Sequence, residues 1–246
     1  MSYIPHIIVS IIAIAFGQVT KHLCKKMPAW VSEKISLKEY LTSLKHGFKV
    51  DIKYTIIYLI LFNLLVYLNG FSYITILFLF CIFSLMLVFS VDYRYELIPD
   101  ECHIIIALMG VINLCFNLSN WYSYFIGALI GGGSFYLLGI LALWIYKKEG
   151  MGFGDVKLMA ALGFLFGIKN ILVITILSFA LGAVISILLM ILKIKKLDSY
   201  IPFGPFIVIA TLLVMFFGVD IFINAYYSLC MTLGTAITDV IFKIVD

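Results

Sequence analysis

The chain has 246 residues, of which 64% are hydrophobic and only 12% are charged. Its mean hydropathy of +1.15 excludes an ordinary soluble domain, in which about half of the residues are apolar. The composition therefore predicts an all-α, polytopic membrane protein. The net charge of +4 follows from the placement of lysines in alternate loops, and nucleic-acid binding is not expected.

Nine apolar stretches approach the length that crosses a hydrocarbon core of about 30 Å, which takes roughly 17 to 25 helical residues. They cover residues 4–19, 54–68, 71–91, 102–118, 121–146, 156–168, 170–192, 202–218 and 221–245. The first is expected to be a retained helix and not a cleaved signal, because its positive charges follow the apolar run. Polar residues interrupt the last one. The sequence predicts one membrane-embedded domain over residues 1–246, a bundle of eight or nine transmembrane helices.

Lysine and arginine gather in alternate loops. Eight lysines lie between the first two apolar stretches, and most of the others follow in every second loop: Arg94, Lys147, Lys148, Lys157, Lys193, Lys195 and Lys196. Because cytoplasmic loops are enriched in Lys and Arg, the amino terminus is predicted to lie outside. Residues 20–53 then form a short cytoplasmic segment, in which residues 36–48 have the spacing of an amphipathic helix on the membrane surface.

Two aspartates at predicted cytoplasmic helix ends are the candidate catalytic residues. Asp92 directly follows the third stretch, at the cytoplasmic end of that helix, and Asp155 follows a glycine-rich turn, residues 150–154, at the cytoplasmic start of the sixth helix. Ionisable side chains are costly to bury in a membrane and mark functional sites there. Two neighbouring carboxylates share one proton, which is how an aspartic protease activates water. Each Asp taken alone also fits a structural role, Asp155 as a helix cap and Asp92 as a helix-end residue beside Arg94.

Three ordered motifs resemble those of the type IV prepilin peptidases, bacterial enzymes that remove the leader from pilins and type II secretion pseudopilins. Residues 150–163 resemble the family's GxGD segment, residues 92–100 its segment with two aspartates separated by seven residues, and residues 201–206 its late Pro-Phe-Gly-Pro segment. The resemblance implies a membrane aspartic endopeptidase whose catalytic pair is Asp92 and Asp155, with no metal or organic cofactor for cleavage. It also implies residues that shape the site: Gly152, Gly154, Pro202, Gly204 and Pro205.

The resemblance implies prepilin or pseudopilin substrates, the lipid bilayer as surroundings, and an active site on the cytoplasmic face of a bacterial inner or cytoplasmic membrane. Glu96, Glu101 and Glu149 would attract a basic leader peptide. Family members that also methylate the new amino terminus with S-adenosylmethionine carry a longer first cytoplasmic loop with two CxxC pairs. Here that loop holds only Cys24. Methylation is therefore left open, and no zinc site or disulfide framework is predicted.

Other readings of the same residues differ in what they require. A proton- or cation-coupled transporter could use the paired carboxylates, but its site would lie near the midplane between matching halves, and no internal repeat is found. A protease of the presenilin type would need deeper carboxylates, and a scaffold would tolerate Asp-to-Asn changes at both positions. Asp100 is expected to cap the following helix, and Lys157 to reach from a helix end to the membrane interface. Cys102 and His103 beside Glu101 lack further spaced ligands for a metal.

Overall fold

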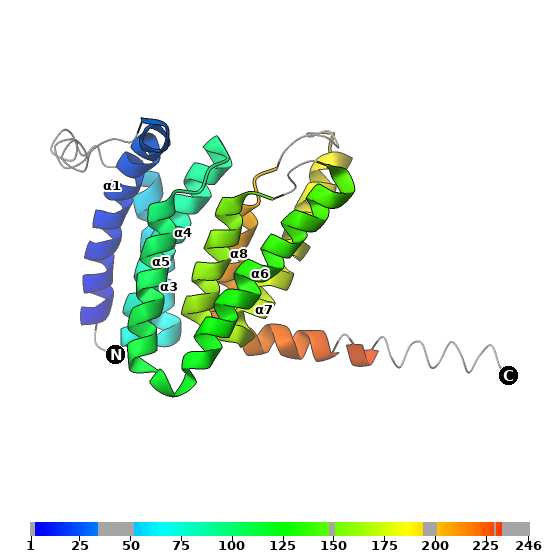
Figure 1. The fold of residues 1–246 in the computed structure, drawn as a ribbon. Helices are drawn as coiled ribbons and strands as arrows, with labels where there is room; N and C mark the ends of the chain where they lie inside the picture. Colours follow the sequence, from blue (N-terminus) through cyan, green and yellow to red (C-terminus); the bar gives the residue numbers. More distant parts are fainter. Residues whose placement is uncertain (1–2, 34–51, 148–150, 194–200, 229, 233–246) are drawn as a thin grey trace.

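The computed structural model describes residues 3–33, 52–147, 151–193, 201–228 and 230–232, and no strand occurs among them (Figure 1). Its elements are α1 (Ile4–Glu33), α3 (Ile52–Asn69), α4 (Tyr73–Tyr95), α5 (Asp100–Phe116), the short η1 (Leu118–Asn120), α6 (Trp121–Tyr146), α7 (Phe153–Ile191) and α8 (Gly204–Phe217). The all-α prediction is confirmed. The predicted surface helix at residues 36–48 lies outside the described residues.

Several helices are long and apolar enough to cross a membrane, as a multi-pass membrane protein requires. Five spans in the described residues meet this criterion: Ile4–Cys24, Ile52–Asn69, Tyr73–Tyr95, Leu118–Ile145 and Phe153–Ile191. A sixth is reached if α8 and the helical segment Val219–Thr232, which bends away from it by 96°, form one broken span. The predicted count of eight or nine is not confirmed, because α5 has only 17 residues and α8 only 14.

Helix α7 is broken at Gly167, whose φ of 74° and ψ of 179° are not helical. In a straight helix Met159 and Ile171 would lie about 18 Å apart along the axis, at 1.5 Å per residue. Both instead contact Gly131 of α6, so the chain folds back on itself at the break. The amide of Ile168 donates to Oγ of Ser123 at 3.2 Å, which caps the second part of the helix. The two stretches predicted on either side of residue 169 therefore correspond to the two parts of α7, with the break two residues earlier.

Helix α4 is the central helix of the bundle. Its most apolar window is 72% buried, against 22% for the windows of α3, α6 and α7. Aromatic side chains of α1 and α3 pack against it, with Tyr58 and Phe62 completely buried and the ring of Phe16 4.5 Å from that of Phe83. The most deeply buried of the five spans therefore carries Asp92 in its last turn.

Helices α6 and α7 pack backbone to backbone through glycines. A Cβ added at Gly127 would lie 2.5 Å from the carbonyl oxygen of Gly163, and one added at Gly132 would lie 2.9 Å from Cβ of Ala160. Small residues let transmembrane helices approach this closely and gain van der Waals contact. The first part of α7 is thus held by α6, with its amino-terminal end beside the end of α4 and the starts of α5 and α8 (Figure 1).

Candidate functional site

Asp92 lies inside the last turn of α4, where only 4% of it is exposed. Its Oδ2 accepts a hydrogen bond of 2.9 Å from the backbone amide of Gly204, the first residue of α8. The positive end of a helix dipole and its unpaired N–H groups stabilise negative charge at such a place. A Cβ added at Gly204 would lie 2.5 Å from that same oxygen, so glycine is what allows the carboxylate to reach the backbone.

Asp155 lies in the first turn of α7, and it too is only 4% exposed. The helix is preceded by Gly152, and no side chain caps its amino terminus. The backbone amide of Asp155 donates to the carbonyl of Gly152 at 3.1 Å, while its Oδ1 is buried and meets no hydrogen-bond partner among the described residues. The alternative role of Asp155 as a helix cap is therefore wrong. Asp155 thus lies at the same end of the bundle as Asp92, since α7 begins at the end where α4 finishes (Figure 1).

The loop between α4 and α5 joins the two aspartates through packing. Glu96 takes a left-handed conformation with φ of 55°, and its amide donates to the carbonyl of Asp92 at 2.9 Å, which ends α4. Ile98 then lies over the start of α7, because a Cβ added at Gly154 would lie 3.1 Å from Cβ of Ile98. Gly154 thus lets the loop pack directly on the turn that carries Asp155.

Asp100 does not cap α5, contrary to the sequence-based expectation. The cap residue is Pro99, and Asp100 is the first residue of the helix. Its Oδ1 accepts a 2.8 Å hydrogen bond from Nζ of Lys157 and lies 3.3 Å from Nδ1 of His103. The hydrogen bond from Lys157 holds the pKa of the Asp100 carboxyl below its usual range. Lys157 is therefore an ion-pair partner that ties α5 to the first turns of α7.

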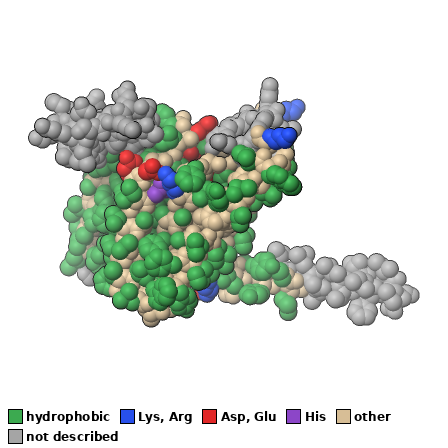
Figure 2. Space-filling view, in the orientation of Figure 1, with side chains coloured by type: hydrophobic (Ala, Val, Ile, Leu, Met, Phe, Trp, Pro, Cys, Tyr) green, Lys and Arg blue, Asp and Glu red, His purple; other side chains and the backbone are tan. Residues whose placement is uncertain are grey.

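A polar cavity opens beside this ion pair. It has a volume of about 440 Å³ and is lined by Leu97, Ile98, Asp100, Glu101, Phe153, Gly154 and Lys157. Acidic, basic and histidine side chains gather at this end of a surface that is otherwise mostly hydrophobic (Figure 2). Of the three glutamates expected to attract a basic peptide, Glu101 lines the cavity and Glu96 is exposed near it, whereas Glu149 lies outside the described residues.

The five residues predicted to shape the site lie in two places. Gly152 and Gly154 form the turn into α7, and an added Cβ at Gly152 would lie 3.4 Å from Oδ2 of Asp155. Pro202 precedes α8, while Gly204 and Pro205 begin it. The resemblance indicated these five positions. It did not indicate the hydrogen bond between Gly204 and Asp92, because the donor is a backbone amide. A proline directly after Gly204, at the start of a helix, is the local sign that this end of the chain begins α8.

No group of three or more His, Cys, Asp or Glu side chains that could hold a metal ion occurs in the described ranges. Nδ1 of His103 lies 3.3 Å from Oδ1 of Asp100, but no third candidate metal ligand joins these two side chains among the described residues. What the site offers is two buried carboxyl groups, one held by a helix amino terminus and one whose Oδ1 meets no hydrogen-bond partner within the described part of the chain. Such a pair can hold a single proton between them and activate water.

Comparison with known proteins agrees with the motifs. The model of the Type IV leader peptidase family matches residues 77–187, which include both aspartates. Among curated proteins, the prepilin leader peptidase/N-methyltransferase of Xanthomonas campestris pv. campestris is 35% identical over 136 residues, covering 54% of this chain and 46% of that protein. The protein of the same name from Legionella pneumophila is 32% identical over 168 residues, covering 64% and 56%.

The chain spans about half the length of the curated relatives that it matches. No solved structure is significantly similar to it. The similarity to peptidases does not favour the transporter alternative.

Proposed function

Because residues 77–187 match the model of the Type IV leader peptidase family, we propose that the chain is a membrane aspartic endopeptidase that cleaves the leader peptide of type IV prepilins or type II secretion pseudopilins. The observation that carries the proposal is the burial of two carboxyl groups at one end of the bundle, Asp92 in the last turn of α4 and Asp155 in the first turn of α7. Burying a carboxyl group in a membrane protein is costly, and such groups mark functional sites.

The two aspartates have different surroundings, and these suggest different roles. Asp92 accepts a hydrogen bond from the amino terminus of α8, which stabilises its ionised form. Asp155 has a buried oxygen without a partner among the described residues, as expected of a group that carries the shared proton or awaits a substrate. In the proposed mechanism Asp92 removes a proton from water as the water attacks the scissile carbonyl.

Asp155, protonated, donates a hydrogen bond to the carbonyl oxygen of the scissile peptide and so stabilises the negative charge that develops there. Collapse of the tetrahedral intermediate breaks the C–N bond, and the leaving amine takes the proton that Asp92 received from water. The water is thus divided between the new carboxyl group and the new amino terminus. The chain's own contribution is to keep both carboxyl groups out of bulk water and close together.

The acidic side of the site supports the choice of substrate. Glu101 lines the polar cavity and Glu96 is exposed beside it, so a basic leader peptide would be attracted there. Reversing both charges, with Glu96→Lys and Glu101→Lys, is expected to raise the KM for a leader that carries lysines while cleavage of a leader with neutral residues is unchanged. Equal KM values for the variant and the wild type would remove this role from the two glutamates.

The site is proposed to face the cytoplasm of a bacterial inner or cytoplasmic membrane, in a chain that crosses it eight or nine times. Support comes from the lysine-rich stretches of the sequence, since the described helix ends that flank them lie at the end of the bundle that holds the aspartates (Figure 1). The relatives are also named N-methyltransferases. Methylation with S-adenosylmethionine is left open for this chain, because residues 34–51 of the first loop lie outside the described residues.

The decisive experiment compares cleavage of a full-length prepilin by wild type, Asp92→Asn and Asp155→Asn, each purified in detergent with a monodisperse elution profile. The matched control is Asp220→Asn, since Asp220 is an exposed carboxylate that pairs with Lys169 at 2.6 Å. Loss of cleavage by a factor of about a thousand or more in both site variants, with the control active, is expected when a reacting group is removed. Cleavage that survives either site variant would reject the proposed pair.

A further inference from the structure

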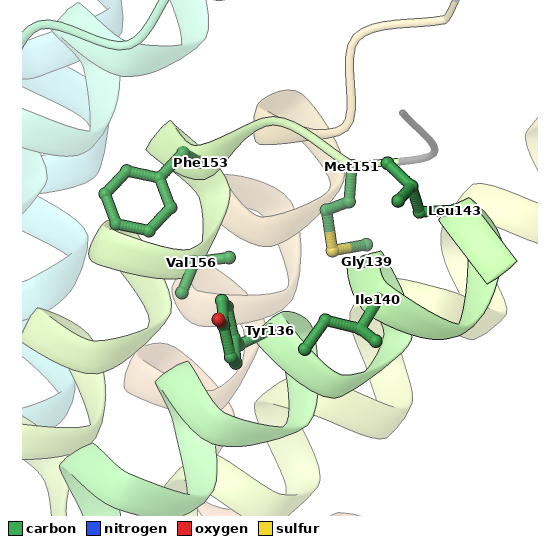
Figure 3. A pocket seen from close by; sticks show the side chains of 7 residues that line it. All are labelled: Tyr136, Gly139, Ile140, Leu143, Met151, Phe153 and Val156. Carbon is green, nitrogen blue, oxygen red and sulfur yellow. The ribbon is translucent and has the colours of Figure 1, made fainter. Parts of the chain in front are cut away.

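A small apolar pocket lies on the other side of Phe153 from the polar cavity. It has a volume of about 230 Å³, and its walls are the last turns of α6 and the turn that enters α7 (Figure 3). Its lining residues are Tyr136, Gly139, Ile140, Leu143, Met151, Phe153 and Val156. No charged side chain is among them. A pocket that binds a whole small-molecule ligand usually measures about 300 to 1,000 Å³, so this one has room for a single large side chain.

The pocket exists because α6 and α7 separate toward this end. Further along the helices, glycines hold the backbones together, as at Gly127 against Gly163 and Gly131 against Met159. Beyond them larger residues take over, and a Cβ added at Gly139 would meet only Cβ of Met151, at 3.9 Å. Gly139 therefore leaves the pocket open, and the neighbouring helix does not fill it.

The outer wall of the pocket faces away from the bundle. Tyr136, Ile140 and Leu143 are each about half exposed, on a helix whose apolar window is only 22% buried. In a membrane this surface meets lipid, so an apolar group can enter from the bilayer without crossing the polar headgroups. Met151 closes one side, and its unbranched thioether side chain adapts to occupants of different shape.

Phe153 separates this pocket from the polar cavity, since it lines both. Asp155, the proposed catalytic residue, follows Phe153 by two positions in the same helical turn. A peptide laid across Phe153 would thus pass the carboxyl group of Asp155. One part of the peptide would lie in the apolar pocket, and the other part would lie beside Asp100, Glu101 and Lys157. The occupant that matches both sides is one polypeptide that is apolar on one side of its scissile bond and basic on the other.

We propose that the pocket between the end of α6 and the turn at Met151 binds an apolar side chain of the substrate, within the first three residues of the part that stays in the bilayer after cleavage. This inference rests on the proposed function, because it assigns the pocket to the same peptide that Asp92 and Asp155 would cleave. It names Gly139 as the residue that keeps this subsite open. The pocket then selects substrates by the size of one side chain near the cleaved bond.

The test fills the pocket from its own wall. Gly139→Leu places a branched side chain in the pocket, and the smaller Gly139→Ala serves if the leucine variant does not fold. Gly133→Leu is the matched control, because it makes the same change on the same helix where nothing lies within 4 Å of an added Cβ. Each protein is assayed in detergent with prepilins that carry Ala, Leu or Phe at each of the first three positions after the scissile bond.

We expect Gly139→Leu to lower kcat/KM for Leu or Phe at one of these positions by about tenfold to a hundredfold, the range for losing the burial of one large apolar side chain. The substrate with Ala there should be cleaved as by wild type, and Gly133→Leu should behave as wild type throughout. An equal loss for all substrates, or no loss for any, would overturn the subsite. One of these results is expected if a lipid chain, and not a substrate side chain, occupies the pocket. Wild type that cleaves none of the prepilins would instead refute the proposed peptidase function.

Discussion

Replacing Gly204 by alanine tests the contact on which the geometry of Asp92 depends. The added Cβ would lie 2.5 Å from Oδ2 of Asp92, a distance that real Cβ atoms essentially never show, and 3.1 Å from its Cγ, which is a tight contact. Asp92 is buried, and only one methylene group joins its carboxyl to the backbone of α4, so relief requires the carboxyl to move away from the start of α8. The hydrogen bond from the Gly204 amide, 2.9 Å long, is then broken.

The size of the effect follows from two terms. A hydrogen bond to a charged group is worth about 1.5 to 3 kcal/mol, which corresponds to roughly a tenfold to 150-fold change in the equilibrium or rate that depends on it. Displacing a reacting group by about 1 Å costs on the order of a hundredfold in rate by itself. We therefore expect kcat/KM of Gly204→Ala to fall by about a hundredfold or more.

The assay is the initial rate of prepilin cleavage in detergent, measured beside the apparent Tm of each protein. Gly133→Ala is the control, since it adds the same methyl group in open space. Gly204→Ala should lose activity while it keeps a cooperative thermal transition, although overpacking lowers its stability by about 1 to 3 kcal/mol. Wild-type activity in Gly204→Ala would refute the argument, because the carboxyl of Asp92 would then work without the position that it holds in the structure.

Three further substitutions concern the helix contacts around the site. Gly163→Leu drives a side chain into the backbone of α6 and is expected to abolish the cooperative thermal transition or lower the apparent Tm by many degrees in detergent. Tyr58→Phe removes a buried hydroxyl that lies 2.8 Å from Oγ1 of Thr20, at an expected cost of about 0.5 to 1.5 kcal/mol in unfolding free energy. Lys157→Met removes the partner of Asp100, and because both side chains are partly exposed the loss should stay below about 1 kcal/mol and shrink in high salt. Since the pKa of Asp100 is lowered, this contribution is present above the ordinary carboxyl pKa of about 3.9 and is lost as the pH falls through the lower folded value.

Each of these expectations has an outcome that contradicts it. An unchanged Tm for Gly163→Leu would mean that the glycine contacts between α6 and α7 do not hold the helices together. A loss above about 3 kcal/mol for Tyr58→Phe would indicate a role beyond one hydrogen bond. A Tm difference between wild type and Lys157→Met that does not shrink as the pH falls below the ordinary carboxyl pKa of about 3.9 would show that the ion pair with Asp100 is not its cause.

The sequence predicted the helices best where apolar runs end at clear signals. Residues 121–146 were predicted as one helix, and α6 has these same bounds, because the preceding polar residues and the following lysines delimit the run. The third stretch was predicted to end at residue 91, whereas α4 continues to Tyr95 and includes Asp92. The apolar run ends before the first charged residue, whereas the helix continues through it. Asp92 is accommodated in the last turn because it is buried against the start of α8.

The contacts of the site were less accessible to sequence analysis, since they join distant segments. The motifs identified Asp92 and Asp155, and their burial at one end of the bundle agrees with the predicted placement of both on the same side. The donor to Asp92 is a backbone amide, which has no sequence signal of its own. The pairing of Asp100 with Lys157 was missed because capping is the commoner role of an Asp at a helix start, and only the packing of the α4–α5 loop on α7 brings the two side chains together.

The bond between Asp92 and Gly204 also affects the order in which the protein becomes complete. Its two partners are separated by 112 residues, whereas α6 and α7 follow one another directly along the chain. Synthesis proceeds from the amino terminus, so both aspartates are made and the α6–α7 pair can form before residue 204 is added. A ribosome-bound chain that ends before this residue has both carboxyl groups but lacks the amide that holds one of them. The arrangement of the site is therefore finished only when α8 has entered the bundle.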